Sequence, residues 1–146
     1  MKESVMHPNE RRVREILNIV HSGRVSGKGL EDYFTPDAYY QPLVPAVAPI
    51  VGPGEIVAEI ARQLTVYKDL HAEIHIIMAD DAHVFTERTD HATFADLGNK
   101  RVSVPVMAVF DFTDGLITAW REIFDTRAAE AQIGVDQKAM SKIMGQ

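Results

Sequence analysis

Four strand-like segments joined by short turns fill the second half of the chain, and this succession constrains the fold more than any other feature. The segments cover residues 70–78, 83–94, 101–112 and 116–124, and turn-forming residues separate them at 79–82, 96–99 and 114–115. Strands that follow one another through such short connections pair as antiparallel neighbours. The sequence therefore predicts a meander of long antiparallel strands.

The segment 101–112 carries apolar side chains on both of its faces. One face contains Val102, Val104, Val106, Ala108 and Phe110, and the other contains Pro105, Met107 and Val109. A strand that is apolar on both faces is covered on both faces. We expect one face to line a cavity and the other to meet a helix or a second subunit, which favours a homodimer formed through the outer face of the sheet.

Helical patterns come before the meander. Apolar residues recur at helical spacing from residue 9 to about residue 20, and a shorter helix is expected over 27–34. A short strand at 38–41, a proline-rich apolar loop and a helix from 55 to about 66 follow. This order predicts an α+β fold with helices packed on one face of a curved sheet. We expect one domain over 1–146, with its core at about 9–133 and a helical tail over 134–146.

Composition excludes several classes of function. The 146 residues have a net charge of −6 without a basic cluster, which argues against nucleic-acid binding. The absence of cysteine excludes disulfides, thiolate metal sites and cysteine nucleophiles. No apolar run is long enough for a membrane span, and the N-terminus lacks the apolar segment of a signal peptide. We expect a cytoplasmic protein that acts on a small molecule.

Charged side chains share strand faces with aromatic ones in the segments 83–94 and 116–124. Because side chains alternate along a strand, Thr86, Arg88 and Asp90 lie on one face. The same alternation groups Thr118, Trp120, Glu122 and Phe124. A guanidinium between two carboxyls in an apolar pocket is suited to paired acid and base chemistry. A structural ion pair at a sheet edge has the same spacing, so both interpretations stay open.

Several stretches resemble limonene-1,2-epoxide hydrolases, which belong to the superfamily of nuclear transport factor 2 (NTF2), ketosteroid isomerase and SnoaL-like cyclases. The resemblance covers about residues 12–130 and rests on residues 87–90 (ERTD), 106–110 (VMAVF), 114–118 (DGLIT) and 120–125 (WREIFD). In that family a carboxylate base activates water, a carboxylic acid protonates the epoxide oxygen, and an arginine bridges both carboxyls. The resemblance implies a cone-shaped, curved antiparallel or mixed sheet with the N-terminal helices packed on its concave face. It also implies that Arg88 is the bridge, Asp90 the acid and Tyr40 a water-binding tyrosine.

Two positions depart from the family pattern. Glu122 stands where the family has its aspartate base, and Pro42 stands where the family has a water-binding asparagine. Glutamate can still act as a base, and we expect Glu122 to be the ionised base, although its carboxyl is displaced by about one C–C bond. Proline supplies neither a side-chain amide nor a backbone N–H.

Three functions follow from these residues. The first is cofactor-independent hydrolysis of a small hydrophobic epoxide. The second is a proton-transfer isomerase or cyclase of the ketosteroid isomerase or SnoaL kind, which needs no fixed water. The third is a non-catalytic small-molecule-binding module. In each case we expect a hydrophobic ligand against a wall formed by Trp120, Val104, Val106, Ala108 and Phe110.

A metal site is the one cofactor possibility that the sequence raises. His71, Glu73 and His75 share one face of the segment 70–78, opposite Ala72, Ile74 and Ile76. Catalytic zinc needs a third ligand with support from a further shell of residues, and this face matches the outer surface of a sheet better. We therefore expect neither a metal nor an organic cofactor.

Overall fold

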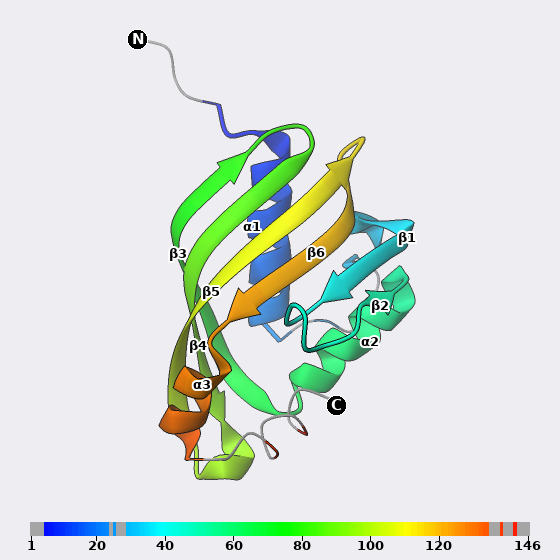
Figure 1. Cartoon of the computed structure of the whole chain (residues 1–146). Helices are drawn as coiled ribbons and strands as arrows, with labels where there is room; N and C mark the ends of the chain where they lie inside the picture. The colour runs from blue at the N-terminus through cyan, green and yellow to red at the C-terminus, as the bar shows by residue number, and fades with distance from the viewer. Residues whose placement is uncertain (1–4, 24, 26–28, 135–137, 139–141, 143–146) are drawn as a thin grey trace.

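The computed structural model describes residues 5–23, 25, 29–134, 138 and 142, and it follows the order of elements expected from the sequence (Figure 1). The helices are α1 (Pro8–His21), α2 (Pro53–Gln63) and α3 (Thr126–Ile133), with short 3-10 turns at Glu31–Tyr33 and Ala95–Leu97. The strands are β1 (Phe34–Gln41), β2 (Ile50–Val51), β3 (Tyr67–Ala79), β4 (His83–Phe94), β5 (Lys100–Thr113) and β6 (Leu116–Phe124).

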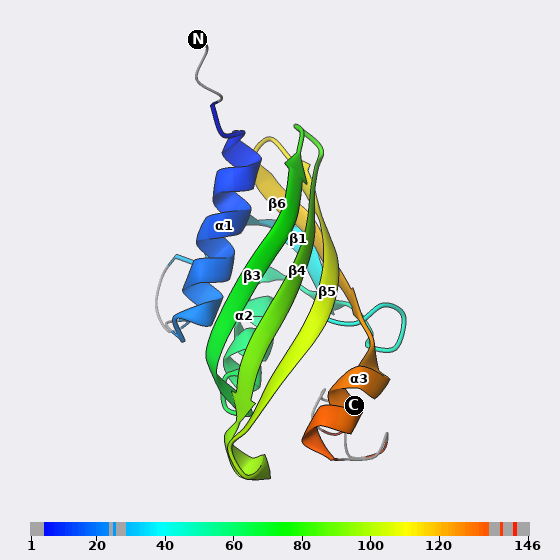
Figure 2. The same cartoon turned by 90° about the vertical axis from the view of Figure 1, so that its left-hand side faces the viewer.

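One mixed sheet organises the described part of the chain, with the strand order β2-β1-β6-β5-β4-β3. Its neighbouring strands are antiparallel, except for the parallel pair β1 and β6. The sheet does not close into a barrel, and it curves around α1 and α2, which lie on its concave side (Figures 1 and 2). α1 packs against β3 and β4, whereas α2 packs against β1. This arrangement confirms the predicted NTF2-like α+β fold.

Apolar stripes attach the two helices to the sheet. Their buried residues are Val13, Ile16 and Leu17 in α1 and Ile56 and Ile60 in α2. The positions recur at three and four residues, which is the spacing of a single helix face. Burial of each large aliphatic side chain stabilises the fold by roughly 1.5–3 kcal/mol. The stripes thus fix both helices over the concave face.

α3 begins at an N-cap, Asp125. The Asp125 carboxylate accepts hydrogen bonds from the backbone N–H groups of Arg127 at 2.9 Å and Ala128 at 3.4 Å. The helix then packs against β5. There Ala129 and Ile133 join Phe94 and Val102 in a small apolar cluster, separate from the main core.

The expected helix over residues 27–34 is wrong where the structure describes it. Residues 31–33 form one 3-10 turn, β1 already starts at Phe34, and residues 27 and 28 lie outside the described part. β1 contains Pro36, which lacks the N–H that a regular ladder needs. The register between β1 and β6 shifts around this residue, so the strand accommodates the proline.

The register of β3 with β4 shifts at two points, and the second of them breaks the alternation that the sequence predicts. The register with β4 shifts between Ile74 and Ile76, and Ile76 turns outward with 45% of its surface exposed. Ile77 takes the inward position and packs against the core. Ile76 therefore lies in one row across the outer face of the sheet with Glu87 and the exposed Met107 and Ile123.

Among the residues that the structure describes, no helix is long and apolar enough to cross a membrane. The helical tail expected over 134–146 falls almost entirely outside these residues. The cytoplasmic location and the domain boundaries stay predictions.

Candidate active site

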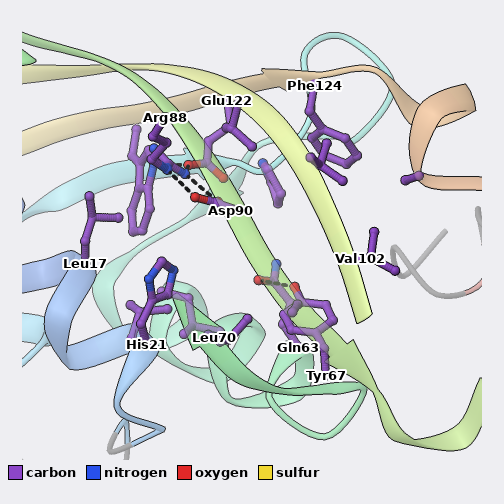
Figure 3. A pocket seen from close by; sticks show the side chains of 18 of the residues that line it. Leu17, His21, Gln63, Tyr67, Leu70, Arg88, Asp90, Val102, Glu122 and Phe124 are labelled. Carbon is purple, nitrogen blue, oxygen red and sulfur yellow. Dashed lines mark hydrogen bonds and ion pairs between the residues drawn. The ribbon is translucent and has the colours of Figure 1, made fainter. Parts of the chain in front are cut away.

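A cavity of about 140 Å³ lies between the concave face and the helices (Figure 3). Most of its wall is apolar and comes from Leu17, Ile60, Val102, Val104, Val106, Trp120 and Phe124. Its polar side chains are His21, Tyr40, Gln63, Tyr67, Arg88, Asp90 and Glu122. One water needs roughly 10–15 Å³ of such space, so the cavity has room for a small organic molecule with a water beside it. Apolar pockets with a few convergent polar groups are typical of small-molecule sites.

The Arg88 guanidinium is 2% exposed and contacts both carboxyls of the cavity (Figure 3). Its Nε and Nη2 donate to Oδ1 and Oδ2 of Asp90 at 2.8 and 3.1 Å. Nη2 also donates to Oε2 of Glu122, and Nη1 donates to Oγ1 of Thr86 at 3.0 Å. Alternation along β4 puts Thr86, Arg88 and Asp90 on the concave face, and β5 lies between β4 and the strand of Glu122. The guanidinium thus bridges two carboxyls from non-adjacent strands, as the strand parity predicts.

Glu122 is buried, and its carboxylate is bound mainly through one oxygen. Oε2 accepts from Arg88 and from the indole Nε1–H of Trp120 at 3.1 Å. Within the described part of the chain, Oε1 accepts no hydrogen bond. That oxygen is therefore available to a molecule in the cavity.

Burial raises the pKa of Glu122 above its ordinary value. The positive charge of Arg88 opposes this rise, the negative charge of Asp90 adds to it, and the hydrogen bonds from Arg88 and Trp120 again lower the pKa. Both carboxyls contact the same guanidinium, which brings their charges close together.

Tyr40, which the sequence singles out, lies in the cavity with its ring 4.6 Å from that of Trp120. Its hydroxyl accepts a hydrogen bond from Nε2 of Gln63 at 3.4 Å, and Oε1 of Gln63 accepts from the Tyr67 hydroxyl at 2.9 Å. Burial, with a further contribution from the charge of Glu122, raises the pKa of Tyr40 well above its ordinary value. The hydroxyl is consequently neutral at physiological pH and can donate a hydrogen bond.

Gln63, Tyr67 and His21 are cavity residues that the sequence reasoning missed. Gln63 has a recognisable signal, because it continues the buried positions Ile56 and Ile60 of α2 at helical spacing but is polar. His21 ends α1 and also lines a polar groove between α1 and β3. Burial lowers the pKa of His21 to about 4, so its imidazole is neutral at physiological pH.

The predicted wall residues divide into two groups. Val104, Val106 and Trp120 line the cavity, as does Pro42. Ala108 and Phe110 are buried in the main core and are not among the described lining residues. The Phe110 ring lies 5.0 Å from that of Trp120, so it supports the wall from behind.

The side chains expected as the best metal candidates form other contacts. His75 Nε2 lies 2.8 Å from Oγ1 of Thr89, and the His71 ring stacks on His91 at 5.9 Å. The Glu73 carboxylate lies 3.3 Å from Nε2 of His91. Within the described residues, no group of three His, Asp or Glu side chains is arranged to hold a metal ion.

Comparison with known proteins assigns the chain to a protein family. The model of the SnoaL-like domain matches residues 13–120. Epoxide hydrolase EphG of Mycobacterium tuberculosis is 40% identical over 72 residues, which are 49% of this chain and 46% of that protein. The chain thus aligns with about half the length of that relative.

Solved structures extend the likeness over nearly the whole chain. An LEH-like epoxide hydrolase from M. tuberculosis superposes with a TM-score of 0.72 and 26% identity, covering 92% of this chain and 96% of that one. An NTF2-like protein of unknown function from Burkholderia pseudomallei gives a TM-score of 0.75 at 17% identity, covering 88% and 98%, and shows the fold alone. Since the family model covers most of the sequence and the fold agrees, the chain belongs to the SnoaL-like domain family, within the NTF2-like fold.

Proposed function

We propose that this protein is a cofactor-independent epoxide hydrolase that adds water to a small hydrophobic epoxide. The observation that carries the proposal is the Arg88 guanidinium, which holds Asp90 and Glu122 together in an otherwise apolar cavity. The names of two relatives, epoxide hydrolase EphG and an LEH-like epoxide hydrolase, support the same reaction class.

The two carboxyls together carry one proton at the start of the reaction, so one acts as the acid while the other acts as the base. Water attacks an epoxide carbon and forms a new C–O bond while the ring C–O bond breaks. Glu122, as the ionised base, takes a proton from the water, and Asp90, as the acid, gives its proton to the ring oxygen. The product is a vicinal diol. A proton then returns from Glu122 to Asp90, directly or through solvent, and restores the starting state.

The surroundings of the two carboxyls support these roles. Oε2 of Glu122 accepts two N–H donors, which leaves Oε1 for the water. The raised pKa of Glu122 makes this carboxylate a stronger base than an ordinary one when it is ionised. The side chain of Asp90 is 26% exposed, so solvent reaches the group that must be reprotonated in each cycle.

The cavity favours a compact apolar substrate. Val104, Val106 and Trp120 give it an apolar wall, and the space of about 140 Å³ suits a small molecule. The charged side chains Arg88, Asp90 and Glu122 gather in one place, apart from His21, Gln63 and Tyr67 (Figure 3). We therefore place the epoxide ring beside the carboxyls and the hydrocarbon part of the substrate against β5. Every step in this scheme uses side chains of the chain itself.

One observation favours a second function, proton transfer in an isomerase or cyclase. Pro42 lines the cavity and offers no amide to hold a water, whereas moving a proton beside a carbonyl needs no fixed water. The SnoaL-like family assignment is compatible with this chemistry. In that reaction Glu122 alone would remove and return a proton.

Turnover of a panel of small epoxides, followed by diol formation, tests the proposal. We expect diol from the wild type and losses of at least about 10²-fold in Glu122→Gln and Asp90→Asn, because each lacks one proton-transfer group. Asp111→Asn is a matched control, since Asp111 pairs with Arg121 outside the cavity. A wild type that ignores every epoxide but isomerises a ketosteroid-like substrate in a Glu122-dependent way would instead establish the second function.

We also propose that two copies of the chain pair through the outer face of the sheet. Ile76, Met107 and Ile123 are exposed there, in a row that also contains Glu87, and Met78 adds a side chain that is 64% exposed. Large exposed apolar rows on a sheet are typical of subunit interfaces. A second copy would cover this row and leave the cavity on the opposite, concave face accessible.

A further inference from the structure

A chain of hydrogen bonds runs from the start of β3 through α2 to the cavity. The Tyr67 hydroxyl donates to Oε1 of Gln63 at 2.9 Å, and Nε2 of Gln63 donates to the Tyr40 hydroxyl at 3.4 Å. Gln63 and Tyr67 lie side by side at the edge of the cavity (Figure 3). Neither side chain has a part in the two proton transfers described above.

The neighbours of Gln63 fix the direction of these hydrogen bonds. Nε2 of Gln63 also lies 3.4 Å from Oε1 of Glu59, and a carboxylate can only accept. Arg62 holds that carboxylate in place with bonds of 2.9 and 2.7 Å. The nitrogen end of the Gln63 amide therefore faces Glu59 and Tyr40, and the oxygen end faces Tyr67, which must donate.

This direction determines what the Tyr40 hydroxyl can do. Because the hydroxyl oxygen accepts from Gln63, its own proton points away from the amide. Tyr40 packs against Trp120, whose indole donates to Glu122, and the charge of Glu122 acts on the Tyr40 hydroxyl, so the free donor lies within electrostatic range of the base. Pro42, which lines the same cavity, has no donor that could take this place.

We propose that Gln63 is a positioning residue, which turns the hydroxyl proton of Tyr40 toward the water beside Glu122. This inference rests on the proposed hydrolysis. A water that donates one hydrogen to Glu122 and accepts one from Tyr40 keeps its remaining lone pair for the epoxide carbon. Gln63 thus supplies indirectly, from α2, the orientation that a polar side chain at position 42 would supply directly.

A double-mutant cycle tests whether Gln63 acts through Tyr40. At 3.4 Å its bond to Tyr40 is long, so we expect Gln63→Leu to lower kcat by only about 5- to 10-fold, the value of one neutral hydrogen bond, with little change in KM. In a Tyr40→Phe background the same substitution should lower kcat by less than about twofold, because the hydroxyl that it orients is gone. An equal loss in both backgrounds, or no loss in either, would overturn the proposal.

Two further variants separate positioning from folding. Tyr67→Phe removes the donor that fixes the Gln63 amide, so it should also lower kcat. This variant tests the proposal even if Gln63→Leu folds poorly. Tyr33→Phe is its control, since the Tyr33 hydroxyl donates to Glu15 at the surface, and it should leave kcat unchanged. Equal effects of both tyrosine substitutions would contradict the proposal.

A measurement without substrate separates failure of this inference from failure of the proposed function. NMR of protein labelled at tyrosine Cζ reports the four tyrosines, and Gln63→Leu should shift the signals of Tyr40 and Tyr67 but not those of Tyr33 and Tyr39. Unshifted Tyr40 and Tyr67 signals overturn the orienting role whatever the activity. A wild type inactive on every epoxide, with the expected shifts, overturns the hydrolase proposal and with it the role toward water.

Discussion

Replacing Arg88 with lysine keeps a positive charge in the cavity but removes the planar fork that reaches both carboxyls. The guanidinium donates to Asp90 through two nitrogens, to Thr86 through a third, and to Glu122. A lysine ammonium offers its donors from a single atom. It can stay close to Asp90 or to Glu122, but it cannot reproduce the spacing between them.

The expected loss follows from the bonds that lysine gives up. A hydrogen bond to a charged group contributes roughly 1.5–3 kcal/mol, so losing contact with one carboxyl should lower kcat/KM by about 10- to 100-fold. Stability should fall less, because the raised pKa of Glu122 allows this carboxyl to take up a proton when its cation is lost. A loss of about 1–1.5 kcal/mol in the free energy of unfolding would lower Tm by roughly 3–6 °C.

Steady-state diol formation and a melting curve on the same preparation provide the assay. Arg121→Lys is the matched control, since Arg121 makes a paired bond to Asp111 at 2.7 and 2.9 Å and also contacts Tyr39, outside the cavity. We expect it to lower Tm but to keep kcat/KM within about twofold of wild type. Unchanged turnover in Arg88→Lys, or an equal loss in Arg121→Lys, would show that the bridging geometry has no role in the reaction.

Three further predictions concern pH, assembly and metals. Because the folded pKa of Glu122 is raised, the folded state holds a proton that the unfolded chain has already released, and stability falls as pH rises from about 4.5 through that raised pKa. In melting curves recorded across this pH range, the Tm of the wild type should fall relative to that of Glu122→Gln. Above the range the difference in Tm should stay constant. A difference that is constant at every pH would contradict the raised pKa. Light scattering at micromolar concentration should give twice the mass of one chain, and Met107→Glu with Ile123→Glu should give a monomer, whereas a monomeric wild type would refute the pairing through this face. Dialysis against a chelator should leave turnover unchanged, and a loss restored by a divalent ion would revive the metal site of His71, Glu73 and His75.

Strand parity was sufficient to predict that Arg88, Asp90 and Glu122 lie together. Arg88 and Asp90 are two residues apart in β4, so alternation alone puts both side chains on one face. The short turns fix the order of β4, β5 and β6, which brings Glu122 across β5 toward Arg88. These inferences need only the alternation of side chains along a strand and the length of the turns between strands, and both can be read from the sequence.

Departures from local regularity were not predictable in the same way. A register shift in β3 turned Ile76 outward, and an interrupted ladder allowed β1 to run through Pro36. Both depend on the neighbouring strand, which local pattern does not include. The contribution of α2 to the cavity was missed because the helical period marks a buried face without showing what it faces. Gln63, polar among buried isoleucines, was the visible sign.

A single turnover in water labelled with oxygen-18 tests the central claim, that carboxylates activate water to open an epoxide directly. With enzyme in excess over a small apolar epoxide, each protein molecule reacts at most once, and mass spectrometry of the diol shows the source of the added oxygen. The account predicts that the heavy isotope appears in the diol in this first turnover. Unlabelled diol, with the label later found in the Glu122 or Asp90 carboxyl, would mean that a carboxylate attacks the epoxide itself, and absence of diol would contradict the hydrolase function altogether.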